Sequence, residues 1–114
     1  MNTNRERKNK YRNIKATLDG HTFDSMAEMH RYAELKMLEK AGYISDVKLQ
    51  VPFVLQEGFR DRFGKRWQPI KYIADFVYFE NGEMVIEDTK GFRTREYQLK
   101  KKMMAYRGYH IKEI

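Results

Sequence analysis

The sequence predicts a single domain of the α/β (α+β) class, with a mixed sheet flanked by helices and a small N-terminal hairpin. The chain has 114 residues, which fits one domain of ordinary size. Its hydrophobic share of 41% is enough for one core without disulfides or a structural metal. Strand-like and helix-like patterns then alternate in the order hairpin, helix, three strands, helix, strand, for which a mixed sheet is the simplest arrangement.

The first elements are a basic arm and a short hairpin. Residues 1–12 are polar and lack apolar periodicity, so we expect a flexible basic arm before a domain that spans 13–114. Apolar residues alternate from 14 to 18. Asp19-Gly20 then favours a two-residue turn, and 21–23 returns as the second strand.

Two helices are marked by their end signals. The first is predicted over about 25–41, since Ser25 can cap it, Glu28 stands at the capping-box position and Gly42 supplies a stop. The second begins at Thr94 and ends at Gly108, with apolar residues at helical spacing between them.

Strand signals fill the rest of the chain. Residues 47–55 alternate as a strand, which Pro52 places at a sheet edge or a bulge. A basic loop over 56–68 follows. Two β-rich runs, 71–80 and 83–91, are joined by Asn81-Gly82, a strong signal for a two-residue hairpin. The final six residues are short and β-prone.

Composition restricts the function. The absence of cysteine excludes disulfides, thiolate zinc sites and a cysteine nucleophile. No apolar run reaches the roughly 20 residues of a membrane span, and the N-terminus is charged where a signal peptide turns hydrophobic, so we expect a cytoplasmic protein.

The net charge of +7 is unevenly distributed, with +5 in residues 1–15, +4 in 60–71 and +6 in 93–112. Acidic residues gather between these segments. This layout suits a polyanion-binding surface around an acidic centre, although solvated charged faces kept for solubility explain most such runs equally well.

The predicted hairpin brings acidic residues together. If Asn81-Gly82 is the turn, opposed residue numbers sum to 163, so Asp75 faces Asp88. Carboxylates directly opposite on antiparallel strands repel one another unless a cation lies between them. Lys90 shares a face with Asp88, and Glu87 points to the other face. One interpretation is solvated carboxylates neutralised by Lys90; the other is a site, because the same face carries apolar residues.

Glu28 also has two interpretations. It can be a capping-box residue alone, or it can begin the buried stripe of its helix and reach the Asp75/Asp88 end as an outer-shell ligand that holds a metal-bound water. Oxygen ligands without cysteine or clustered histidine suit Mg²⁺ or Mn²⁺. A carboxylate-bound divalent ion beside a lysine is a means of hydrolysing phosphodiesters.

These residues resemble a known signature. Asp75 followed by Asp88-Thr89-Lys90 looks like the PD-(D/E)XK motif of restriction-endonuclease-like nucleases, and Glu28 matches the acidic helix residue that precedes it. The runs FDSMAEMHRY, YIADFVY, VIEDTKGF and TREYQLKKK are similar to those of small phage and prophage proteins of this superfamily. Ala74 stands where the motif has proline, and Asp88 where glutamate is commoner.

The resemblance implies an αβββαβ core and a catalytic set of Glu28, Asp75, Asp88 and Lys90. It also implies metal ligation by Asp75, Asp88 and the Thr89 carbonyl, and Gln50 resembles a polar residue often found near such sites, although a solvent-facing glutamine is equally consistent. We therefore expect a Mg²⁺- or Mn²⁺-dependent DNA endonuclease, resembling a Holliday junction resolvase, in phage recombination, replication or packaging. The alternative is a non-catalytic nucleic-acid-binding protein that keeps the nuclease fold.

DNA is the expected partner of a homodimer that needs no membrane and no organic cofactor. The aromatic residues Phe63 and Trp67 in the basic loop either stack on an unpaired base or pack back onto the core. Arg93 lies at the start of the second helix, where a phosphate can bind. The candidate DNA-binding residues are Arg5, Arg7, Lys8, Lys10, Arg12, Arg62, Lys65, Arg66, Arg93, Lys100 and Lys102.

Overall fold

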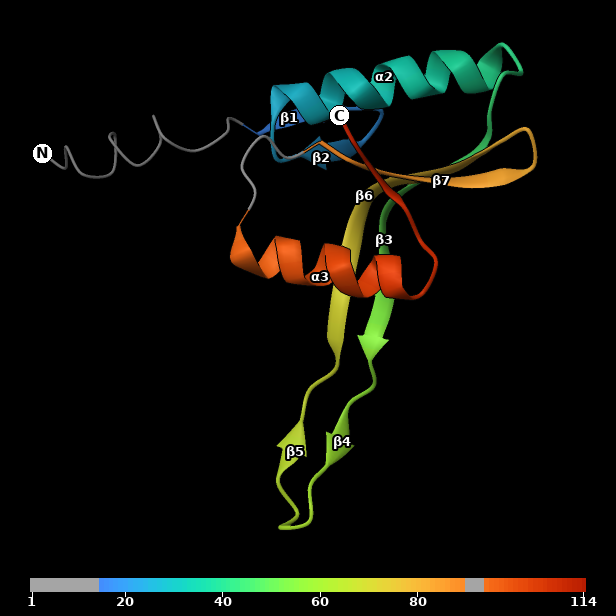
Figure 1. The fold of residues 1–114 in the computed structure, drawn as a ribbon. Helices are drawn as coiled ribbons and strands as arrows, with labels where there is room; N and C mark the ends of the chain where they lie inside the picture. Colours follow the sequence, from blue (N-terminus) through green and yellow to red (C-terminus); the bar gives the residue numbers. More distant parts are fainter. Residues whose placement is uncertain (1–14, 90–93) are drawn as a thin grey trace, which may run out of the picture.

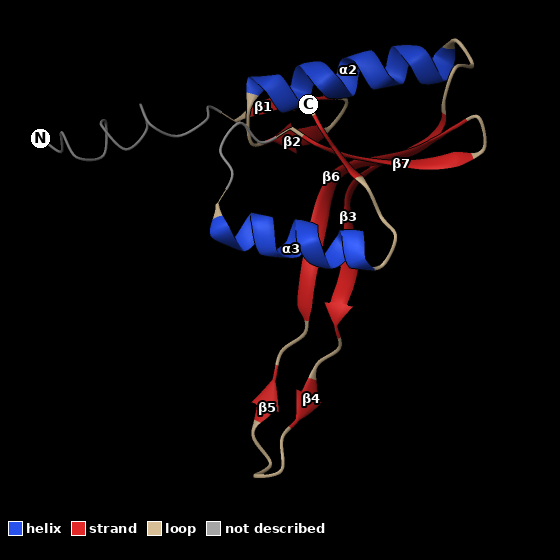
Figure 2. Ribbon diagram, in the orientation of Figure 1, coloured by secondary structure: helices blue, strands red, loops and turns tan. Residues whose placement is uncertain are grey.

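The computed structural model describes residues 15–89 and 94–114. Its elements follow the predicted order: a hairpin of β1 (Ala16–Leu18) and β2 (His21–Phe23), helix α2 (Met26–Lys40), strand β3 (Ser45–Gln56), strands β6 (Ile70–Glu80) and β7 (Glu83–Asp88), helix α3 (Arg95–Tyr106) and strand β8 (Ile111–Glu113) (Figures 1 and 2). The main sheet has the order β3-β6-β7-β8, with β8 parallel to β7 and the other pairs antiparallel. The predicted α+β class with a mixed sheet is confirmed.

The helix boundaries agree with their end signals. The Ser25 hydroxyl accepts a hydrogen bond from the Glu28 backbone N–H at 3.1 Å, and the Thr94 hydroxyl accepts one from the Tyr97 N–H at 3.0 Å. Pro52 is accommodated because β3 is an edge strand, as predicted. Within the described residues, no helix is long and apolar enough to cross a membrane.

The Asn81-Gly82 turn sets the register of β6 against β7. Five consecutive pairs, from Glu80–Glu83 to Phe76–Glu87, have residue numbers that sum to 163. The ladder ends there, so Asp75 and Asp88 lie just beyond its last pair. The register prediction is therefore confirmed up to the Phe76–Glu87 pair, which is next to the two aspartates.

The predicted basic loop contains a further hairpin, which the sequence pattern did not predict. Strand β4 (Phe59–Arg60) pairs with β5 (Arg66–Trp67), and the two extend the β3/β6 ribbon away from the helices (Figure 1). Gly58 lies between β3 and β4, and a Cβ there would stand 3.0 Å from the Trp67 carbonyl oxygen and 3.2 Å from the Pro69 Cδ. A larger residue at this position would therefore require these neighbours to move by a few tenths of an ångström.

Two hydrophobic clusters hold the helices on the sheet, and the β3/β6 ribbon passes from one to the other. On β6, Phe76 and Tyr78 pack in the cluster beneath α2, whereas Tyr72 and Ala74 pack in the cluster beneath α3. In a regular strand the side chains of these four residues would all point to the same face and pack against one helix, because they are spaced by two. The ribbon changes the face that it turns to each helix at Asp75 on β6 and at Gln50 on β3. Gln50 has a φ of 51° and is left out of the pairing between β3 and β6.

Candidate active site

The two aspartates predicted to form the site are buried. Asp75 is 3% exposed and Asp88 is fully buried, so the interpretation of solvated carboxylates is wrong. The apolar stripe predicted on this face, Ile73, Val77, Met84 and Ile86, is only half buried, since Val77 and Ile86 are 4% and 2% exposed but Ile73 and Met84 are 48% and 46% exposed. The change of faces at Asp75 accounts for the exposure of Ile73.

Asp75 is held by the end of β7. Its Oδ2 accepts hydrogen bonds from the Thr89 backbone N–H at 2.8 Å and from the Thr89 hydroxyl at 2.9 Å. This contact links the middle of β6 to the residue that follows β7, beyond the last β6–β7 pair. Asp75 is therefore fixed by the residue whose carbonyl the family resemblance implies as a metal ligand.

Glu28 reaches Asp75 through a glutamine. The Gln50 Nε2 donates to Glu28 Oε2 at 3.1 Å and to Asp75 Oδ1 at 3.4 Å. Glu28 is only 6% exposed, so the prediction that it faces the sheet and reaches this end is confirmed. Gln50 is not simply solvent-facing: its left-handed backbone lies at the point where the ribbon changes faces, and its amide links two acidic side chains.

Asp88 is held by a tyrosine. The Tyr72 hydroxyl donates to Asp88 Oδ2 at 2.8 Å. Burial is the main cause of a raised pKa of Tyr72, followed by this hydrogen bond and by the negative charges of Asp88 and, more weakly, Asp75. The Tyr72 hydroxyl therefore stays protonated and remains a donor beside both carboxylates.

A neighbouring salt bridge connects α2 to β7. Arg31 Nε donates to Glu87 Oε1 at 2.8 Å and its terminal nitrogen to Glu87 Oε2 at 2.6 Å, and the Tyr78 hydroxyl donates to the same carboxylate. Glu87 is fully buried and lies on the opposite side of the strand from Asp88, as predicted. Burial alone would raise the pKa of Glu87, but the hydrogen bonds from Arg31 and Tyr78 lower it overall.

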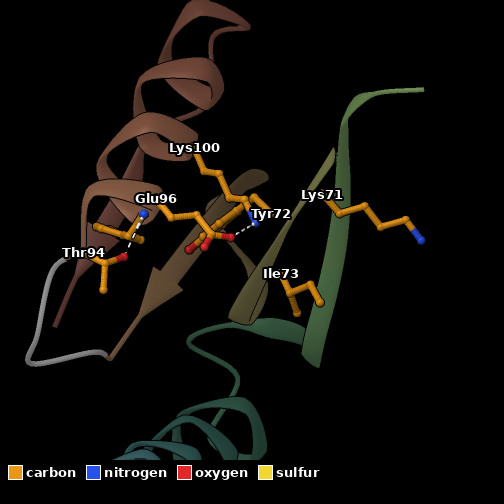
Figure 3. Close-up of a pocket in the computed structure, with 7 residues that line it drawn as sticks. Lys71, Tyr72, Ile73, Thr94, Glu96 and Lys100 are labelled. Carbon is orange, nitrogen blue, oxygen red and sulfur yellow. Dashed lines mark hydrogen bonds and ion pairs between the residues drawn. The ribbon is translucent and has the colours of Figure 1, made fainter. Parts of the chain in front are cut away.

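Two hollows lie beside these carboxylates. One, of about 270 Å³, is lined by β2, the start of α2 and the Leu49–Gln50 segment, including Glu28. The other, of about 310 Å³, lies between β6 and α3 and is lined by Tyr72 and Lys100. Figure 3 shows Lys100 and Glu96 reaching over Tyr72, with an ion pair of 2.9 Å between them, whereas Lys71 points away.

Several predicted residues lie outside the described ranges. These are Lys90, Arg93 and the arm residues Arg5, Arg7, Lys8, Lys10 and Arg12. Of the others, Lys102 is exposed on α3, and Arg62, Lys65 and Arg66 lie exposed on the β4–β5 hairpin and its turn.

The acidic residues do not already form a complete metal cluster in the described part of the chain. Within residues 15–89 and 94–114, no three His, Asp or Glu side chains are close enough together to hold an ion. Gln50, Thr89 and Tyr72 instead hydrogen-bond to the carboxylates. The metal site implied by the resemblance stays a prediction.

Comparison with known families shows to which family the chain belongs. A family model described as a protein of unknown function (DUF1064) matches residues 8–114. The chain belongs to the DUF1064 family. No curated protein and no solved structure shows a significant match to it.

The DUF1064 match covers every described element, so β6, β7 and the carboxylates of Asp75 and Asp88 lie inside the family region. Tyr72 and Arg31 are the contact residues that sequence reasoning missed. Arg31 follows Glu28 by three positions and so shares its helix face, a spacing that could have indicated a partner on the sheet. Tyr72 carries no comparable signal, because its contact with Asp88 depends on the bent ribbon.

Proposed function

We propose that this DUF1064 chain is a divalent-metal-dependent endodeoxyribonuclease of the PD-(D/E)XK kind. In this proposal it hydrolyses phosphodiester bonds of branched DNA, such as Holliday junctions, during phage recombination, replication or packaging. The observation that carries the proposal is the burial of Asp75, in the middle of β6, and of Asp88, at the end of the neighbouring strand β7, with Glu28 linked to Asp75 through Gln50.

The burial of these carboxylates supports a chemical role because it reduces the stability of the folded protein. A carboxylate removed from water destabilises the folded protein unless hydrogen bonds or a cation compensate. Here Asp75 and Asp88 are both buried, and Glu28 is buried and linked to Asp75 through Gln50, within a chain of net charge +7. A protein that only needed a stable sheet end would gain more from apolar residues, so the acidic group is best explained by chemistry.

The donor set fits a hard divalent cation. Asp75 and Asp88, with the Thr89 carbonyl, would hold Mg²⁺ or Mn²⁺, and Glu28 would lie in its outer shell. When bound, such an ion would polarise a phosphate and lower the pKa of a water molecule.

The remaining polar residues position this acidic set. Thr89 fixes one oxygen of Asp75, while the Gln50 amide orients Asp75 and Glu28 toward each other. Tyr72 holds Asp88 from the α3 side with a hydroxyl that stays protonated. Lys90, two residues after Asp88, is assigned the role of positioning the attacking water or stabilising the developing charge.

DNA would be held by the basic segments around this centre. Lys100 and Lys102 on α3 and the basic residues of the β4–β5 hairpin would contact phosphates, together with Arg93 and the N-terminal arm. A chain this small covers little DNA. A homodimer would therefore be needed to cut both strands of a branched substrate.

The second candidate is a non-catalytic nucleic-acid-binding protein that retains the fold. The observation that favours it is that hydrogen bonds from Gln50, Thr89 and Tyr72 engage the carboxylates. In that case these residues would hold the end of the sheet together, and the basic surface alone would account for the function.

Cleavage assays with labelled branched and linear DNA, in Mg²⁺, Mn²⁺ or EDTA, separate the two candidates. We expect wild-type protein to cut in the divalent metals only. Asp88→Asn and Lys90→Ala should each abolish cleavage while leaving DNA binding largely intact, because phosphate contacts elsewhere supply the affinity. Asp46→Asn is the matched control, since Asp46 is an exposed aspartate at the start of β3.

A melting experiment adds a readout that needs no DNA. A divalent ion that binds only the folded state at about ten times its dissociation constant stabilises by roughly 1.4 kcal/mol, or on the order of 5 °C. Asp88→Asn should lose most of this shift and Asp46→Asn should keep it. Cleavage by Lys90→Ala or Asp88→Asn at the wild-type rate would refute the catalytic assignment, and binding without any cleavage would favour the second candidate.

A further inference from the structure

The β4–β5 hairpin ends in an ordered turn that presents a phenylalanine. The Gly64 N–H donates to the Asp61 carbonyl and the Asp61 N–H to the Lys65 carbonyl, both at 2.9 Å, and Gly64 has a φ of 83°. This is a type I turn followed by a left-handed glycine. The Asp61 carboxylate also accepts from Phe63 N, Lys65 N and the Trp67 indole at 2.9–3.0 Å. Phe63 is therefore held at a fixed tip.

Aromatic surface on this hairpin does not pack back onto the core. Phe63 is 84% exposed at the tip, and Phe59 and Trp67 are 47% and 43% exposed. The last two form a stacked cross-strand pair, with ring centroids 6.3 Å apart and an angle of 18° between the planes. Exposed aromatic surface is unfavourable in water, so the hairpin is suited to a partner that covers the rings.

The charges identify the chemistry of that partner. Arg60 and Arg66 are directly opposite one another in the β4/β5 ladder, an arrangement that destabilises a hairpin until an anion lies near both. Lys65 Nζ lies 4.1 Å from the centroid of Trp67, and the Arg62 guanidinium 5.1 Å from that of Phe63. Cations interleaved with exposed rings match the alternating phosphates and bases of a nucleic acid.

We propose that the β4–β5 hairpin is a branch-recognition element in which Phe63 stacks on an unpaired DNA base while the flanking cations contact the adjacent phosphates. Stacking requires a base that is not already stacked within a duplex, so Phe63 would select forks and junctions over paired DNA. This inference deepens the proposed function, since it rests on DNA being the substrate and names the residue that determines its structure.

The distance from the tip to the carboxylates gives the inference a geometric consequence. Twelve residues separate Phe63 from Asp75 along one side of the ribbon, and at about 3.3 Å per residue the tip lies at most about 40 Å away. One turn of duplex DNA spans about 34–36 Å. A base stacked on Phe63 would therefore lie no farther than slightly more than one helical turn from the phosphodiester at the candidate active site.

Equilibrium binding in EDTA tests the inference without any requirement for cleavage. The probes are a forked DNA with two unpaired arms and a fully paired duplex of the same length. Phe63→Ala should weaken binding to the fork by about 5- to 150-fold, the loss expected for one stacked base, and change duplex binding less than about twofold. Phe63→Trp should restore fork binding because it keeps a ring, whereas Phe63→Leu should not.

The matched control is Tyr106→Ala, which removes another highly exposed aromatic ring, 93% exposed at the end of α3. It should bind the fork as wild type does. Equal binding of the fork by Phe63→Ala and wild type, or an equal loss on both DNAs, would overturn the proposal. A change of oligomeric state in Phe63→Ala would instead identify the tip as a self-association surface.

The two proposals can fail separately. Loss of fork preference in Phe63→Ala without cleavage by wild-type protein would remove the nuclease assignment and keep the hairpin assignment. Metal-dependent cleavage that Phe63→Ala does not change would keep the nuclease assignment and remove the hairpin assignment.

Discussion

Replacement of Arg31 by alanine should cost more stability than any surface change on α2. The arginine side chain is only 18% exposed and makes a two-point contact with Glu87, whose carboxylate is fully buried. Truncation leaves that carboxylate with the Tyr78 hydroxyl as its remaining strong donor among the contacts described above. Breaking a buried ion pair on one side costs about 3–5 kcal/mol.

This loss is large relative to the total stability of a small domain, which is about 5–15 kcal/mol. At about 4–8 °C per kcal/mol, Arg31→Ala should melt at least about 12 °C below wild type. Urea unfolding followed by circular dichroism measures the free energy of unfolding directly, and a constant slope with denaturant would indicate that only the native state has changed.

Glu34→Ala is an internal control, because Glu34 pairs with the same arginine. Its carboxylate is 65% exposed and lies 3.3 Å from the other terminal nitrogen of Arg31. Loss of an exposed pair costs about 0–1 kcal/mol. If Arg31→Ala unfolded with a free energy within about 1 kcal/mol of wild type, the salt bridge would not be what fastens α2 to β7.

Two further predictions concern pH and salt. Because the pKa of Glu87 is lowered in the folded state, its contribution to stability is present above its unfolded pKa of about 4.3 and is lost as the pH falls through the folded value. Wild-type protein should therefore lose more unfolding free energy than Glu87→Gln between about pH 5 and pH 3, and parallel urea-unfolding curves would contradict this. Deletion of residues 1–10 should weaken binding to all DNA sequences alike and reduce the log–log salt slope by about 0.9 for each lost phosphate contact. An unchanged slope in a salt titration would mean that these residues do not touch DNA.

Much of the fold follows from local signals. The Asn81-Gly82 turn predicts the register of β6 against β7, and the caps at Ser25 and Thr94 predict both helix starts. The turn of the β4–β5 hairpin also had a signal, because Asp61 and Gly64 occupy the first and fourth positions of a type I turn. The sequence nevertheless predicts only a loop there, because strands of two residues are too short to show an alternating pattern.

The candidate site was only partly predictable. Residue spacing predicted the register that brings Asp75 and Asp88 to the positions next to the last β6–β7 pair, and it indicated that Glu28 reaches Asp75. It could not indicate that the ribbon changes faces at Gln50, because glutamine carries no preference for a left-handed backbone. For the same reason the contacts of Tyr72 with Asp88 and of Gln50 with Glu28 follow from tertiary structure alone.

The left-handed backbone at Gln50 also sets a limit on evolution and engineering of this chain. A non-glycine residue in that conformation costs roughly 1–2 kcal/mol, so glycine at this position would be favoured by stability alone. Glycine would at the same time remove the amide that links Glu28 to Asp75. Selection for heat resistance without selection for activity would therefore favour loss of this glutamine, because the backbone strain and the link between the carboxylates reside in one residue.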